Sequence, residues 1–195
     1  SKAVCRLPRI LNWKIEIIHA NDWHTGLVPV YVHDYRSGDS FYRDVRTLFT
    51  IHNLQYQGQF DLSLFYWTNL SSIYCGDDQL KFYDSINFMK AAIVYADRVN
   101  TVSPTYTQEI HYPFFAQGLQ NVIQAYDGKI SGILNGVDDQ VWNPKTDRKI
   151  FYPYDSSSLS LRKKNKKALQ EKYGLPVQAN RPLVSMVTRL TSMKG

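Results

Sequence analysis

The sequence has only two cysteines, Cys5 and Cys75, and they lie far apart in the chain. A disulfide framework is therefore not expected, and a reducing compartment is favoured. No apolar stretch approaches the roughly 20 residues that a membrane span needs, and the N-terminus lacks the charged-then-apolar pattern of a secretory signal. The spacing of histidines and carboxylates matches no strong zinc signature. These absences argue against disulfide-stapled, membrane-spanning and zinc-binding classes of protein.

The composition is that of a folded protein. Hydrophobic residues make up 44% of the 195 residues and aromatic residues 14%, which is enough for one large domain, or for one domain and part of another. Two neighbouring aromatics, Tyr66 and Trp67, lie in the stretch DLSLFYW. Their rings suit stacking on sugars, but we expect them to pack inside the protein.

Positive charge is concentrated in one segment. Between Lys145 and Lys172 there are nine basic residues against three acidic ones, which accounts for the whole net charge of +6. The stretch RKKNKKALQEKYG predicts a helix that ends at Gly174, before Pro176. Such a run is typical of a solvated helix face, and it lacks the interleaved aromatics of a nucleic-acid stacking platform. We expect neither nucleic acid nor membrane as a partner.

Short apolar runs alternate with helical patterns along the chain. Strands are predicted at 15–20, 46–53, 97–103, 130–138 and 183–187, and helices at 25–35, at 85–96 and from Pro104, with Ser103 as the N-cap. Segment 143–159, rich in proline, serine and charge, is the best linker candidate. Alternation of this kind indicates an α/β fold with a parallel sheet that helices cover on both faces.

Polar side chains follow each predicted strand, at the edge where parallel sheets bind ligands. We expect the carboxyl ends of the strands to form one composite site from these residues: Asp22, His24, His52, Asn53, Ser103, Asn135, Gly136, Arg189 and Lys194. The two cations at the end of the chain suit a phosphate-binding turn.

Part of this set also allows another interpretation. The stretch HANDWH, with His52, offers His19, Asp22 and His24 as ligands of a metal-dependent hydrolase. We expect His19 instead to lie in a strand and to point into the core. Asp22 also suits a helix cap, and His52 a hydrogen-bonded loop position.

Five stretches are informative because of their order: HANDWHTGLVPVYV, FTIHNLQYQGQF, INFMKAAIVYADRVNTVSPTYTQEI, GILNGVDDQVWNP and TRLTSMKG. Together they resemble the motif series of bacterial glycogen synthases and plant starch synthases. The resemblance implies the GT-B glycosyltransferase fold, in which two Rossmann-like domains each have a parallel sheet. Met193 departs from the pattern, since glutamine is common there and methionine donates no hydrogen bond.

The resemblance also implies an activity. It is the transfer of glucose from ADP-glucose, or as second choice UDP-glucose, to the non-reducing end of an α-1,4-glucan, glycogen or starch, with retained configuration. Arg189 and Lys194 would bind the donor diphosphate, His52 and Asn135 its glucose, and Asp22 would line the acceptor side. We expect no metal and no cofactor, because the nucleotide sugar is itself a substrate. The residues implied as catalytic are Asp22, His52, Arg189 and Lys194, and those implied as substrate-binding are Asn135, Gly136, His52, Arg189 and Lys194.

The same resemblance divides the chain. Residues 1–137 would be the later part of the N-terminal Rossmann-like domain, 138–180 the interdomain crossover with the basic helix, and 181–195 the first strand and phosphate-binding turn of the C-terminal domain. Enzymes of this kind are longer, so we expect a central fragment that transfers no glucose by itself. A non-catalytic glucan-binding or interaction fragment is the alternative. The expected location is the bacterial cytoplasm or the plastid stroma.

Overall fold

The computed structural model describes residues 1–191. The chain forms two compact units, Ser1–Asn135 and Gly136–Gly195. Within the described residues, every strand and every helix except α7 belongs to the first unit. The finer division into 1–137, 138–180 and 181–195 stays a prediction.

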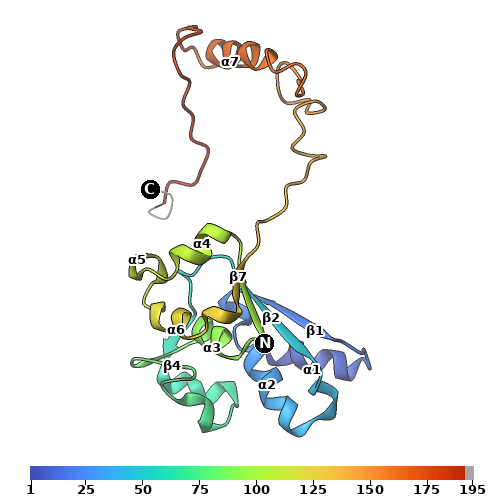
Figure 1. Ribbon diagram of the computed structural model, residues 1–195, viewed down its shortest axis with the longest axis vertical. Helices are drawn as coiled ribbons and strands as arrows, with labels where there is room; N and C mark the ends of the chain where they lie inside the picture. The colour runs from blue at the N-terminus through green and yellow to red at the C-terminus, as the bar shows by residue number, and fades with distance from the viewer. Residues whose placement is uncertain (192–195) are drawn as a thin grey trace. The chain divides into compact units, whose positions relative to one another are not determined.

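A four-stranded parallel sheet organises the first unit (Figure 1). Its strands are β1 (Ile17–Asn21), β2 (Arg46–Ile51), β6 (Arg98–Thr101) and β7 (Ile130–Gly132), in the spatial order β1-β2-β6-β7. All three neighbouring pairs are parallel, which confirms the α/β class. The apolar runs predicted these strands correctly, although β7 is shorter than the run 130–138.

Helix α1 precedes the sheet, and further helices connect its strands, as the alternating pattern predicted. The helices of the first unit follow in chain order. They are α1 (Lys2–Ile10), α2 (Val28–Gly38), α3 (Phe88–Tyr95), α4 (Pro104–Glu109), α5 (Pro113–Ala116) and α6 (Gln120–Ala125), with 3₁₀ turns η1 (Trp23–Thr25), η2 (Ser40–Tyr42), η3 (Leu62–Thr68), η4 (Ser72–Cys75) and η5 (Asp127–Lys129). The predicted N-cap of α4 is confirmed, because Ser103 Oγ accepts the Tyr106 N–H at 3.2 Å.

One face of the parallel sheet forms the core. Ile18, Ala20, Phe49, Ile51 and Val99 are buried on it, and α2 packs against β2 and α3. Side chains of β1 alternate between buried and exposed, because successive residues of a strand point to opposite faces. The second face of the sheet is open at the edge strand β1, whereas Thr50 of β2 and Asn100 of β6 are buried on it.

This alternation also corrects the placement of His19. The residue lies in β1 as predicted, but its side chain is on the exposed face. On the same face Ile17 is 63% exposed, and Arg46 and Arg98 are exposed. The apolar neighbours Ile17 and Ile18 made the whole run look buried, whereas only every second residue is.

A second, antiparallel sheet was not predicted. It joins β3 (Gln59–Asp61), β5 (Ser85–Asn87) and β4 (Lys81–Phe82) in the order β3-β5-β4. The first three residues of the helix predicted at 85–96 belong to β5, and α3 begins only at Phe88. Strands of two or three residues are too short to show an alternating pattern in the sequence.

The second unit contains the basic helix α7 (Leu161–Lys172). It stops before Gly174, whose φ of 63° suits glycine, so this helix is confirmed. Residues 183–187, predicted as a strand, form none; no described segment pairs with them, and a strand needs a hydrogen-bonded neighbour. Among residues 1–191, no helix is long and apolar enough to cross a membrane.

Candidate active site

Asp22 follows β1 directly, in a backbone conformation that aspartate rarely adopts. Its φ is 54° and its ψ is 175°, a region that is essentially restricted to glycine and costs other residues of order 1–3 kcal/mol. Its N–H donates to the Thr50 carbonyl (3.0 Å), its carbonyl accepts from the Thr25 N–H (3.1 Å), and its Oδ1 accepts from the His52 N–H (2.9 Å). Strain of this kind concentrates at functional sites, which makes Asp22 the strongest candidate in this unit.

His52 follows the neighbouring strand β2, and Asn21 fixes its ring. Nε2 of His52 lies 3.0 Å from Oδ1 of Asn21, the last residue of β1. Because a carboxamide oxygen only accepts hydrogen bonds, Nε2 of His52 is the donor of this bond. The structure therefore brings Asp22 and His52 together, as predicted, and adds Asn21 as the residue that orients the imidazole.

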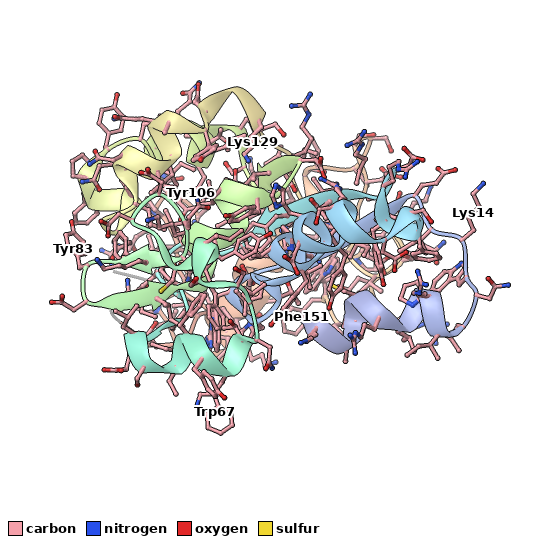
Figure 2. The ribbon with its side chains drawn as sticks, turned by 90° about the horizontal axis from the view of Figure 1, so that it is seen from below. Lys14, Trp67, Tyr83, Tyr106, Lys129 and Phe151 are labelled. Carbon is pink, nitrogen blue, oxygen red and sulfur yellow. The ribbon has the colours of Figure 1, made fainter. Side chains whose placement is uncertain are left out.

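Helix α4 supports the loop that carries His52. The Leu54 N–H donates to Oη of Tyr106 at 3.3 Å, and the Tyr106 ring, labelled in Figure 2, lies against the core. Burial raises the pKa of the Tyr106 hydroxyl above its ordinary value, so this group stays neutral. The first residues after β2 are thus held at the edge of the sheet where Asp22 lies.

A chain of polar side chains crosses the second face of the sheet, from the exposed His19 of β1 to the buried Thr50 and Asn100. Nε2 of His19 lies 2.7 Å from Oγ1 of Thr50, and this hydroxyl donates to Oδ1 of Asn100, also at 2.7 Å. Since the hydroxyl has one proton and gives it to Asn100, it accepts from His19. Thr50 and Asn100 were missed by the sequence analysis, because a single threonine or asparagine in a strand gives no signal of its own.

The histidines and Asp22 do not form a metal centre. His24 stacks on Trp23, with ring centroids 4.0 Å apart, while His19 is engaged with Thr50. Among residues 1–191, no three His, Cys, Asp or Glu side chains gather in a group that could hold a metal ion. The hydrolase interpretation thus has no metal-binding site in the described part of the chain.

Beside Asp22, Trp23 forms one wall of a cavity of 470 Å³, here called the Trp23 cavity. Its shape depends on Gly58, whose φ is 64°; a Cβ there would lie 2.5 Å from the Trp23 ring. Among residues 1–191, no charged side chain lines the cavity; the lining residues are Trp23, Gln55, Tyr56, Gln57, Gly58, Gln59, Phe60 and Gln117. Aromatic rings and carboxamides together suit a neutral ligand with many hydroxyl groups.

The carboxamides of this cavity are held in place by one another. Oε1 of the buried Gln57 accepts from the side chains of Gln59 (2.9 Å) and Asn87 (2.6 Å), and its Nε2 donates to the Gln117 carbonyl at 2.9 Å. Gln57 therefore uses both ends of its amide inside the protein. A network that is satisfied in this way is rigid, so the cavity is preorganised.

The remaining predicted site residues belong to other parts of the chain. Asn135 is the exposed last residue of the first unit, and Gly136 is the first residue of the second. Arg189 is exposed in the second unit, and Lys194 lies outside the described residues. Ser103 caps α4. The roles given to Asn135, Gly136, Arg189 and Lys194 stay predictions.

One half-buried and one buried lysine of the first unit, Lys129 and Lys90, serve the fold. Nζ of Lys129, labelled in Figure 2, donates to the carbonyls of Val94 and Ala96, both at 2.8 Å. Burial lowers the pKa of Lys129 to about 8. Lys90, which is only 6% exposed, donates to the carbonyls of Asp77 and Lys81. Both lysines satisfy backbone oxygens and lie among core residues, so we assign them no part in the site.

Comparison with known proteins identifies relatives along the whole chain. The model of the starch synthase catalytic domain matches residues 1–125. The glycogen synthase of Finegoldia magna is 52% identical over 195 residues, which is all of this chain and 41% of the relative. The glycogen synthase of Bacillus cereus is 43% identical over 196 residues, again 41% of its length. This chain thus spans about two fifths of the length of these relatives.

A solved structure agrees with the sequence comparison. The catalytic domain of Starch Synthase IV from Arabidopsis thaliana, bound to ADP and acarbose, is 34% identical, with a TM-score of 0.81 over 97% of this chain and 39% of that one. The predicted α/β fold of the GT-B type and the predicted resemblance are both confirmed. Because the family model matches residues 1–125 and the fold agrees with it, the chain belongs to the starch synthase catalytic domain family.

Proposed function

We propose that this chain is part of a retaining glucosyltransferase, which moves glucose from ADP-glucose to the non-reducing end of an α-1,4-glucan. UDP-glucose is the second choice of donor. The observation that carries the proposal is the strained Asp22 beside the oriented His52, at the sheet edge where ligands bind in α/β folds. The glycogen synthases and the starch synthase that resemble the chain support the reaction class.

In the proposed chemistry, positively charged side chains lie where negative charge develops on the diphosphate. As the glycosidic bond to the nucleotide breaks, the sugar becomes oxocarbenium-like and negative charge builds on the departing diphosphate. Cations stabilise that charge, and Arg189 and Lys194 are proposed to supply them. No metal ligand is part of this mechanism.

Other polar side chains would orient the sugars. His52 is proposed to hydrogen-bond the 6-hydroxyl of the donor glucose, through an imidazole that Asn21 holds in one orientation. Asn135, with Gly136, would contact the same glucose. We assign Asp22 to the acceptor side, where the uncharged Trp23 cavity offers rings and carboxamides to a glucan. Its Oδ1 already accepts the His52 N–H, so we propose no nucleophilic role for it.

A chimera tests the proposal. The 195 residues of this chain would replace the matching segment of the Finegoldia magna glycogen synthase, and incorporation of labelled glucose from ADP-glucose into glycogen would be measured. We expect an active chimera. Arg189→Ala or Lys194→Ala should lower kcat by roughly 10²–10³-fold, the usual effect of losing one preorganised donor, and should change glycogen binding less.

The matched control is Arg181→Ala, which removes another exposed arginine of the same unit and should leave turnover unchanged. Turnover of Arg189→Ala within a factor of a few of the parent chimera would refute the phosphate-binding role. An inactive chimera that nevertheless folds would refute the proposed transfer itself.

The two free cysteines suit the reducing compartment that we propose for this enzyme.

A further inference from the structure

Tyr66 and Trp67 are exposed, contrary to the prediction that they pack inside the protein. They lie on η3, where Tyr66 is 81% and Trp67 76% exposed. Their rings meet edge to face, with centroids 6.2 Å apart, and Figure 2 shows Trp67 projecting outward beyond the ribbon. Two large rings exposed side by side form an apolar surface patch, and such a patch is a candidate site for a ligand or a partner.

A groove of 700 Å³ runs beside Tyr66, between η3 and η4; we call it the η3–η4 groove. Leu62, Phe65 and Leu70 contribute buried or half-buried apolar surface. Exposed hydroxyl and carboxamide groups come from Ser63, Asn69, Ser71 and Ser72. In the part of the chain that the structure describes, no charged side chain lines the groove.

The groove is held in shape by hydrogen bonds to the core. Oη of the buried Tyr31, on α2, donates to the Thr68 carbonyl at 2.7 Å, and Oγ1 of Thr68 donates to the Phe65 carbonyl at 2.7 Å. η3 ends at Asn69, which has a left-handed backbone with φ 53°. Since η3 is anchored in this way, Tyr66 and Trp67 lose little conformational freedom when a ligand stacks on them.

This chemistry selects the class of ligand. A hexopyranose offers apolar C–H faces to aromatic rings, and hydroxyl groups around its rim to serine and asparagine side chains. A nucleotide or a phosphorylated sugar would need cations, and the described lining residues of the groove supply none. An acidic or basic peptide would likewise meet no opposite charge. The uncharged groove is therefore complementary to a neutral sugar polymer.

We infer that the η3–η4 groove, with Tyr66 and Trp67, is a second binding site for the α-1,4-glucan, separate from the Trp23 cavity, with which it shares no lining residue. The inference rests on the proposed function for the identity of the sugar. A shallow stacking site of this kind binds weakly, with Kd of roughly millimolar. On a polymer with many chains, such a site raises the effective concentration of acceptor ends near the enzyme.

The test is a titration of the full 195-residue chain with maltoheptaose, followed by NMR of the aromatic side chains and by electrophoresis in glycogen-containing gels. Tyr66→Ala and Trp67→Ala should each weaken glucan binding at least about fivefold, as expected when a stacking contact of roughly 1 kcal/mol is lost. The matched control is Phe114→Ala, since Phe114 is 80% exposed and meets Phe115 edge to face. It should bind like the parent chain.

A Trp23→Ala variant separates the two sites, because Trp23 lines the Trp23 cavity and does not line the groove. If the groove binds glucan, this variant keeps the shifts of Tyr66 and Trp67 on titration. Parent-like glucan binding by Tyr66→Ala and Trp67→Ala would overturn the inference. Loss of self-association in these variants, with unchanged glucan binding, would also overturn it and would assign the surface to a second copy of the chain. Neither result bears on glucose transfer by the chimera, so the two proposals fail separately.

Discussion

Asp22 combines a useful side chain with an unfavourable backbone. Its carboxylate accepts the His52 N–H and thereby links the exits of β1 and β2. Its φ and ψ lie in a region that only glycine adopts without strain. If stability alone had determined this position, glycine would be the better residue. The position keeps a carboxylate although its backbone conformation disfavours every residue except glycine. This is a physical reason, independent of any relative, to place function at Asp22.

Replacing Asp22 tests this strain directly. Asp22→Gly should be more stable than Asp22→Ala by about 1–2 kcal/mol, because both lack the carboxylate and only glycine relieves the backbone. Urea unfolding of the two variants measures the difference. The control compares Ser37→Gly with Ser37→Ala on α2. There the alanine variant should be the more stable by roughly 0.5–1 kcal/mol. Equal stability of the two Asp22 variants would mean that the position is unstrained.

Among single residues, the sequence predicted some site members and missed others for clear reasons. Asp22 and His52 were found because polar residues after apolar runs mark strand ends. Asn21 was passed over, since its role depends on a partner 31 positions away in the chain. The exposure of His19 and Tyr66 was mispredicted, because residue type alone does not tell which face of an element is covered.

At the scale of elements, a carboxylate ties three segments of the first unit together. Asp97, just before β6, accepts hydrogen bonds on Oδ2 from Arg36 of α2 (2.6 Å) and from the N–H and hydroxyl of Thr47 on β2 (2.7 and 2.8 Å). Burial alone would raise the pKa of Asp97, but these bonds outweigh it and lower the pKa below the ordinary value of 3.8. The charged form is therefore the one that the fold stabilises.

This lowered pKa predicts a loss of stability in acid. Between the two pKa values the unfolded chain binds more protons than the folded one, so stability rises with pH there. The contribution should be complete above about pH 5 and should disappear as the pH falls below 3.8 towards the lowered pKa. Urea unfolding at a series of pH values measures it.

The matched variants are Asp97→Asn and Asp44→Asn, which remove the same charge. Asp97→Asn should cost roughly 1–3 kcal/mol at pH 6 and should flatten the acid dependence. Asp44 is exposed, so its variant should behave like the parent chain. An unchanged acid slope in Asp97→Asn would contradict the assigned role.

The elements themselves were predicted where their pattern is long. Runs such as 46–53 and the capped start at Ser103 gave correct strands and helices, because periodicity and capping act within a few residues. The β3-β5-β4 sheet was missed, since its strands have two or three residues. Segment 183–187 has the composition of a strand but no described partner, and composition cannot supply one.

For the whole molecule, the proposed binding of the diphosphate by side chains gives a prediction about the chimera. Its transfer of glucose should survive exhaustive dialysis against a chelator, because side chains and helix N-termini would neutralise the diphosphate. Activity with and without EDTA is the measurement. Loss of activity that zinc or magnesium restores would contradict the proposed mechanism and favour a metal-assisted one.

The two units differ in how much of each is buried. Every buried apolar side chain of the described residues belongs to the first unit, between Cys5 and Ile123, whereas Gln170 is the buried residue of the second. Local unfolding is easiest where few apolar groups are buried. The second unit should therefore open first, and its many lysines and arginines should become accessible to trypsin.

Limited proteolysis measures this difference. Trypsin should first cut between Lys145 and Lys172, in the linker and α7, and a product that retains the first unit should accumulate. Sites within packed elements of the first unit, such as Arg36, Arg46 and Lys90, should be cut later; mass spectrometry of a time course gives the order. Chymotrypsin is the control for the abundance of basic sites, and it should cut first at the exposed Phe151 and Tyr152. Early cleavage at Arg46 or Lys90 would mean that the parallel sheet does not form a stable core in this chain.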